Sequence, residues 1–122
     1  MLKKILLVDD DPGVHVVTVP ILTKAGYTVV SAKSGEQGLQ LALNERPDLI
    51  ILDVIMPGIK GRDLCAKIKA YQVLAAIPVV FLTAKDSHDD IQAEQQAGAI
   101  AHLTKPVHAG QLIETVKGII GS

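Results

Sequence analysis

The 122-residue sequence has little of three things that would assign it to a particular class of protein. It has one cysteine, Cys65, and so cannot form an internal disulfide, which is typical of a reducing compartment. Its formal net charge is only -1, from 12 basic and 13 acidic residues, which gives no reason to expect nucleic acid or a membrane as a direct partner. Its N-terminal apolar stretch is cut off by acidic residues and is too short for a signal peptide or a membrane span. We therefore expect a cytoplasmic protein.

Five apolar runs, rich in β-branched residues, alternate with stretches of helical spacing. They are KILLVD (4–9), TVVSA (28–32), DLIILDV (48–54), VVFLT (79–83) and AIAHLT (99–104). The runs are apolar at successive positions, so both faces of the sheet are expected to be covered by helices, which favours parallel strands. With 48% hydrophobic residues and no repeat or linker, the sequence predicts one α/β domain over residues 1–122. We expect a doubly wound sheet of five parallel strands, with five helices on its two faces.

Polar residues mark where the predicted helices begin. Asp11 is expected to cap the first helix, Ser34 opens a capping box, and Ser87 is expected to cap a helix in the segment HDDIQAEQQAG. Pro20 lies inside the first helical pattern, where it lacks the N–H that would bond the carbonyl oxygen of Val16. We therefore expect the first helix to be kinked or split at Pro20.

Acidic residues follow two of the predicted strands. Asp9 and Asp10 end the first strand and Asp53 ends the third. If the strand order is 2-1-3-4-5, these strands are neighbours where the order reverses, which is where open α/β sheets bind ligands. Thr83, at the end of strand four, and Lys105, after strand five, fall at the same edge. Clustered carboxylate oxygens suit Mg²⁺ or Mn²⁺, and such an ion would offset their mutual repulsion.

Four motifs, ILLVDDDP, LIILDVIMPGIKG, PVVFLTA and LTKP, resemble in order and spacing the receiver domain of bacterial two-component response regulators, of the chemotaxis-regulator type. The resemblance runs over essentially the whole chain. It implies a flavodoxin-like fold with strand order 2-1-3-4-5. It also implies a protein that is not a stand-alone enzyme but takes part in its own phosphorylation and dephosphorylation, which depend on Mg²⁺.

The resemblance implies a role for each residue of the acidic cluster. Asp53 would accept the phosphoryl group. Asp10 and Asp53 would bind the metal directly, Asp9 would hold it mainly through water, and the main-chain carbonyl of Ile55 would complete the set. A carboxylate is a usable nucleophile for phosphorus once a metal rather than a proton holds its charge. As a further hypothesis, the apolar Ile55 side chain hinders the attacking water and lengthens the phosphoryl lifetime.

Residues that follow strands four and five would contact the phosphoryl oxygens. The resemblance assigns this role to Thr83 and Lys105, and the backbone N–H of Ala84 would add a neutral donor. Positive charge and oriented donors are what phosphoryl transfer requires of a protein. The resemblance also implies a cis peptide bond between Lys105 and Pro106.

The histidines depart from the family pattern. His102 stands where receivers usually carry the Tyr or Phe ring that turns inward when Thr83 moves toward the phosphoryl group. Two interpretations stay open: an imidazole that changes rotamer in that switch, or a partly exposed polar residue on strand five. His15, His88 and His108 show no spacing typical of a metal site, and we expect them to be solvated or half-buried.

Three functions remain open. The first is a phospho-acceptor switch, which takes its phosphoryl group from a sensor histidine kinase or a histidine phosphotransferase. It would act through residues 87–120 on a downstream protein target or a fused output domain, as a monomer or weak dimer; residues 1–122 themselves contain no output domain and no DNA-reading element. The second is a pseudo-receiver that binds proteins without phosphorylation. The third is a small Mg-dependent aspartyl phosphatase of the haloacid dehalogenase type, whose motif Gly13 does not fit.

Overall fold

The computed structural model of the chain describes residues 2–56, 58–84 and 96–121. The elements are β1 (Lys4–Val8), α1 (Pro12–Lys24), β2 (Thr28–Ala32), α2 (Gly35–Glu45), β3 (Leu49–Asp53), α3 (Gly61–Ala70), β4 (Val79–Thr83), β5 (Ala101–Thr104) and α5 (Ala109–Ile120). The five strands are all parallel in the order β2-β1-β3-β4-β5, as predicted. Only four of the five expected helices lie in the described part, because the one predicted to start at Ser87 falls outside it.

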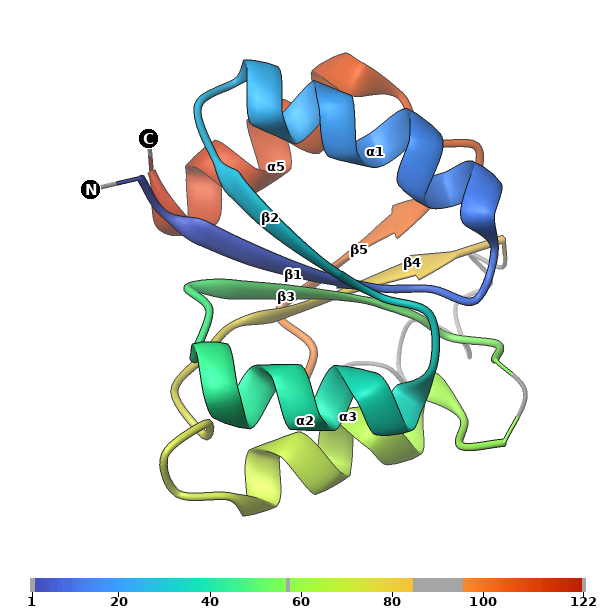
Figure 1. Cartoon of the computed structure of the whole chain (residues 1–122), viewed down its shortest axis with the longest axis vertical. Helices are drawn as coiled ribbons and strands as arrows, with labels where there is room; N and C mark the ends of the chain where they lie inside the picture. Colours follow the sequence, from blue (N-terminus) through green and yellow to red (C-terminus); the bar gives the residue numbers. More distant parts are fainter. Residues whose placement is uncertain (1, 57, 85–95, 122) are drawn as a thin grey trace.

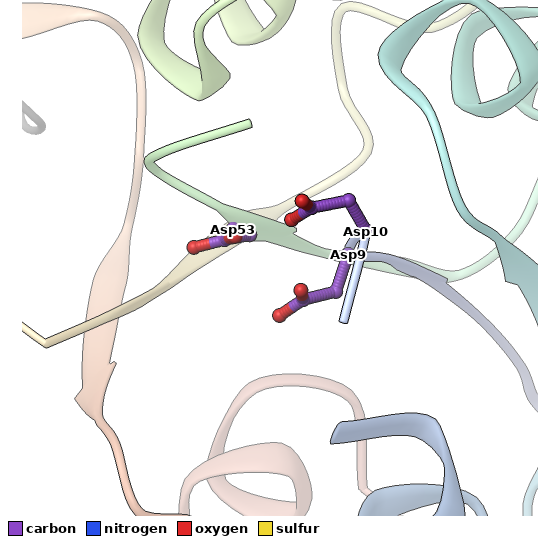
Figure 2. A group of neighbouring side chains, drawn as sticks. All are labelled: Asp9, Asp10 and Asp53. Carbon is purple, nitrogen blue, oxygen red and sulfur yellow. The ribbon is translucent and has the colours of Figure 1, made fainter. Parts of the chain in front are cut away.

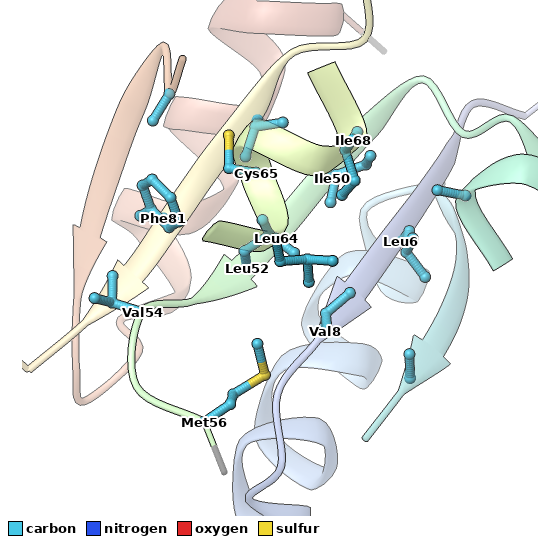
Figure 3. Packing of buried hydrophobic residues seen from close by; sticks show 14 of the residues in the cluster. Leu6, Val8, Ile50, Leu52, Val54, Met56, Leu64, Cys65, Ile68 and Phe81 are labelled. Atoms are coloured by element: carbon cyan, nitrogen blue, oxygen red, sulfur yellow. The ribbon is translucent and has the colours of Figure 1, made fainter. Parts of the chain in front are cut away.

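The sheet is the middle layer of three. Helices α1 and α5 lie on one face, and α2 and α3 lie on the other (Figure 1). Successive residues of each central strand enter opposite cores because side chains alternate along a strand. In β1, for example, Leu6 packs on the α2 and α3 side (Figure 3), while Leu7 packs on the α1 and α5 side. This two-sided burial is why the strands are apolar throughout.

The caps expected for the first two helices are present. Asp11 accepts a hydrogen bond from the Gly13 N–H at 2.9 Å and so caps α1. Ser34 does the same for α2, accepting from the Gln37 N–H at 3.1 Å. Each cap satisfies a backbone donor that has no partner inside the first turn of its helix.

Within the described residues, no helix has the length and apolar character needed to cross a bilayer.

Of the two effects expected at Pro20, a kink or a split of the first helix, the split is wrong. Helix α1 runs unbroken from Pro12 to Lys24 with Pro20 inside it. The reason is the position of Pro20 on the solvent side of the helix, one turn after Val16, whose residue surface is 72% exposed. Water can therefore reach the Val16 carbonyl that Pro20 cannot bond, and the inner face of the helix stays packed.

Candidate functional site

Three carboxyl groups meet where β1 and β3 end. These strands are neighbours, with Val8 in register with Leu52, so Asp9, Asp10 and Asp53 leave the sheet side by side. One oxygen of each carboxyl group lies within 4.8 Å of the others, beyond the strand ends (Figure 2). The predicted acidic cluster is therefore formed by the tertiary structure.

The three acids differ in their exposure to water. Asp9 is fully buried and Asp53 is 4% exposed, whereas Asp10 faces solvent. The buried Asp9 carboxylate is held by the backbone N–H of Asp11, which donates to Oδ1 at 2.9 Å. The cluster thus has two carboxylates in the protein interior and one, that of Asp10, at its solvent-facing side.

Lys105 joins the two buried acids. Its Nζ lies 3.1 Å from Asp9 Oδ2 and 3.3 Å from Asp53 Oδ1. Its main chain is fixed by a hydrogen bond from its N–H to the carbonyl of Thr83 at 2.8 Å, and the Lys105–Pro106 peptide bond is cis, as the resemblance implies. Burial lowers the pKa of Lys105, but its hydrogen bond and charge interactions with Asp9 and then Asp53 outweigh this, and the net pKa lies above its usual value. The ammonium is therefore held charged between the acids.

This arrangement raises the pKa of the Asp53 carboxyl. Burial, followed by the nearby charge of Asp9, raises the pKa of Asp53 from 3.8 to about 6. Lys105 and the Ile55 N–H, which donates to Asp53 Oδ1 at 3.3 Å, lower it in part. One ammonium is thus not enough to offset two buried carboxylates, and further positive charge would stabilise the site.

The remaining predicted residues surround this cluster. Thr83 ends β4, next to β3, and is buried, while Ala84 after it is exposed. Ile55 is 59% exposed, so its side chain covers little of the buried core. His102 is half-buried on β5 in register with Phe81, and register partners in parallel strands point to the same face of the sheet.

Gly61 lets α3 begin directly against the Asp53 peptide. Its N–H donates to the carbonyl of Val54 at 3.0 Å. A Cβ atom at this position would lie only 2.1 Å from the carbonyl oxygen of Asp53, far inside van der Waals contact. The loop that follows β3 therefore depends on the absence of a side chain at Gly61.

The expectation for the other histidines is wrong for His15, which is 7% exposed. Its Nε2 lies 2.7 Å from the backbone carbonyl oxygen of Asp9, so its ring touches the acidic cluster. The available signal was helical spacing, because His15, Thr18 and Leu22 recur at the interval of an inner helix face and all three are buried. His108 is exposed, and His88 lies outside the described residues.

Comparisons with known proteins match the chain over most of its length. A sequence model of the response regulator receiver domain matches residues 5–117. PilH of Pseudomonas aeruginosa is 34% identical over 119 residues, which are 98% of this chain and 98% of PilH. The transcriptional regulatory protein AfsQ1 of Streptomyces coelicolor is also 34% identical over 119 residues, but the chain spans only 52% of its length. The solved receiver domain of sensor histidine kinase PA1611 from P. aeruginosa, with a magnesium ion coordinated in its active site cleft, has a TM-score of 0.91, 30% identity and full coverage of both chains.

Proposed function

The chain belongs to the response regulator receiver domain family, and from that premise we propose that it is a phospho-acceptor whose Asp53 takes a phosphoryl group from a histidine kinase or a histidine phosphotransferase. The observation that carries this proposal is the pairing of the nearly buried Asp53 with Lys105 at 3.3 Å, beside Asp9. A carboxylate with a nearby fixed cation, at the carboxyl edge of a parallel sheet, is placed to receive an anionic group.

The acidic cluster fits a divalent cation such as Mg²⁺. Oxygens from three carboxyl groups lie within 4.8 Å of one another, and hard cations prefer oxygen ligands. Burial and then the charge of Asp9 raise the pKa of Asp53, and a bound cation would offset both effects. Asp53 and the solvent-facing Asp10 would bind the ion directly, Asp9 would act through water, and the Ile55 carbonyl would add a ligand. When bound, the ion would neutralise charge on the carboxylates and on the incoming phosphoryl group.

The chain's own groups would then act on the phosphoryl group. A carboxylate oxygen of Asp53 forms the bond to phosphorus while the bond from phosphorus to the donor's leaving atom breaks. The Lys105 ammonium, the Thr83 hydroxyl and the Ala84 N–H would stabilise the negative charge on the phosphoryl oxygens. For Lys105 this means exchanging part of its contact with Asp53 for a contact with the new anion.

Phosphorylation at Asp53 would change the positions of β4 and β5 through this exchange. Lys105 is tied to Thr83 by a main-chain hydrogen bond, and β5 carries His102 on the same face as the buried Phe81. A shift of Lys105 and Thr83 would therefore reach the surface of β5 and α5, which a downstream protein or an output domain could detect.

Intact mass after incubation with acetyl phosphate tests the proposal. Wild type with Mg²⁺ should gain one phosphoryl group, and neither wild type in EDTA nor Asp53→Asn with Mg²⁺ should gain any. Asp63→Asn is the matched control, because Asp63 is an exposed acid in the first turn of α3 and should leave the reaction unchanged. An adduct that persists in Asp53→Asn would show a different acceptor. If wild type binds Mg²⁺ but gains no adduct from acetyl phosphate or a histidine kinase, the pseudo-receiver alternative would be favoured.

A further inference from the structure

A buried histidine contacts the main chain between two of the acids. His15 Nε2 lies 2.7 Å from the carbonyl oxygen of Asp9, and since a carbonyl only accepts, Nε2 donates. We propose that His15 is a positioning residue that fixes the Asp9–Asp10 peptide and thereby aims the Asp10 carboxylate at the metal. This inference rests on the proposed function, because it assigns His15 a role in the same Mg²⁺ site.

The contact matters because it fixes the Asp9 carbonyl, for which the described residues give no other donor. The Asp9 N–H donates to the Ala32 carbonyl at 3.1 Å, and its carboxylate oxygens are held by Asp11 and Lys105. The Asp9 carbonyl, which His15 holds, lies in the same planar peptide unit as the nitrogen of Asp10. Its orientation therefore sets the direction in which the chain presents Asp10.

The position of the Asp10 carboxylate depends on a fixed backbone more than the positions of Asp9 and Asp53 do. Asp9 and Asp53 are buried and both pair with Lys105, whereas Asp10 is exposed and sits at the mouth of the cluster. An exposed side chain loses more conformational freedom when it binds an ion, so fixing its backbone in advance lowers that cost. Groups that orient metal ligands from outside typically contribute tenfold or more to affinity.

Packing alone does not explain a histidine at this position. Its Nδ1 is buried and has no hydrogen-bond partner among the described residues, and the same holds for Oγ1 of Thr18, three residues further along α1. A buried polar atom without a partner destabilises the fold, and an apolar side chain of similar size would avoid this. Within the described part of the chain, the hydrogen bond to Asp9 is the one contact of the ring that an apolar residue could not make.

The test compares Mg²⁺ affinity with stability in the absence of the ion. His15→Leu removes the donor and keeps the volume, and His15→Gln keeps an N–H within similar reach of the Asp9 carbonyl. Thr18→Val is the matched control, since it removes a buried hydroxyl without a described partner from the same helix face. Mg²⁺ binding is measured by calorimetry on the full chain, and unfolding is measured with urea in EDTA.

We expect the Kd for Mg²⁺ to rise about tenfold or more in His15→Leu and to stay within about twofold of wild type in His15→Gln and Thr18→Val. Stability in EDTA should change little in His15→Leu, because the variant removes the unpartnered Nδ1 but also leaves the buried Asp9 carbonyl without its donor. Unchanged Mg²⁺ affinity would overturn the proposal, and reduced stability in EDTA beside it would show a packing role only. If His15→Leu does not fold, His15→Met replaces it under the same criteria. If wild type itself binds no Mg²⁺, the proposed metal site fails, and the inference fails with it.

Discussion

Replacing Asp53 by asparagine should stabilise the metal-free protein. Burial and the charge of Asp9 raise the pKa of Asp53 from 3.8 to about 6, despite the opposing effect of Lys105. The folded state therefore binds this proton more tightly than the unfolded state does. As a result, the free energy of unfolding falls as the pH rises from about 4 to about 6, and the loss is complete above that range.

The magnitude follows from the difference between the two pKa values. A difference of about two units corresponds to about 3 kcal/mol of unfolding free energy. Asparagine has nearly the same shape and carries no charge, so Asp53→Asn should be more stable than wild type by up to about 3 kcal/mol at neutral pH in EDTA. Near pH 3 the charge-dependent difference should vanish, because Asp53 is protonated in both states. Mg²⁺ should reduce this difference in unfolding free energy at neutral pH. Only the wild type keeps all three carboxylates, so Mg²⁺ should stabilise the wild type more than Asp53→Asn.

Urea denaturation followed by circular dichroism, at a series of pH values with EDTA or Mg²⁺, measures this difference. Asp63→Asn is again the control, because it removes an exposed carboxylate from the first turn of α3 and leaves Asp53 in place, so its stability should follow that of the wild type at every pH. The reasoning is refuted if Asp53→Asn is no more stable than wild type at neutral pH in EDTA. It is equally refuted if the difference between them does not change with pH.

Two further substitutions test the backbone around the site and in α1. Gly61→Ala should lower the free energy of unfolding by about 3 kcal/mol and impair phosphorylation, because its Cβ would meet the Asp53 carbonyl at 2.1 Å. The control Gly118→Ala, in α5 with open space around it, should instead raise stability by about 0.5 to 1 kcal/mol. Pro20→Ala should stabilise by about 1 to 2 kcal/mol in thermal or urea unfolding, because it restores the bond to the Val16 carbonyl; a destabilised variant would contradict this account of α1.

Much of the fold could be predicted because its signals are local. Runs such as LIILD in β3 are apolar at every position, which indicates a strand buried on both faces, and Asp11 and Ser34 cap helices through neighbours two and three residues away. The split expected at Pro20 was wrong because the effect of a proline inside a helix depends on which side of α1 faces solvent. That orientation is set by the sheet and by α5, not by the residues next to Pro20.

The candidate site was predictable to a similar extent. Asp9, Asp10 and Asp53 could be assigned to one edge because parallel strands end at the same side of a sheet. The contact of His15 with Asp9 was missed, since a helix position with buried neighbours does not reveal which polar group the ring will meet. The raised pKa of Asp53 also depends on burial and on distances of a few ångströms, which spacing along the chain does not contain.

The sequence by itself determined the class of the fold, the order of its elements and the residue types of the site, because alternation, caps and motifs act over a few neighbouring residues. The tertiary structure decided which of these groups touch. It placed Lys105 between Asp9 and Asp53, His15 against the Asp9 carbonyl and Gly61 against the Asp53 peptide. Electrostatic and steric effects change steeply over distances of one or two ångströms, and only the packing of distant segments sets those distances.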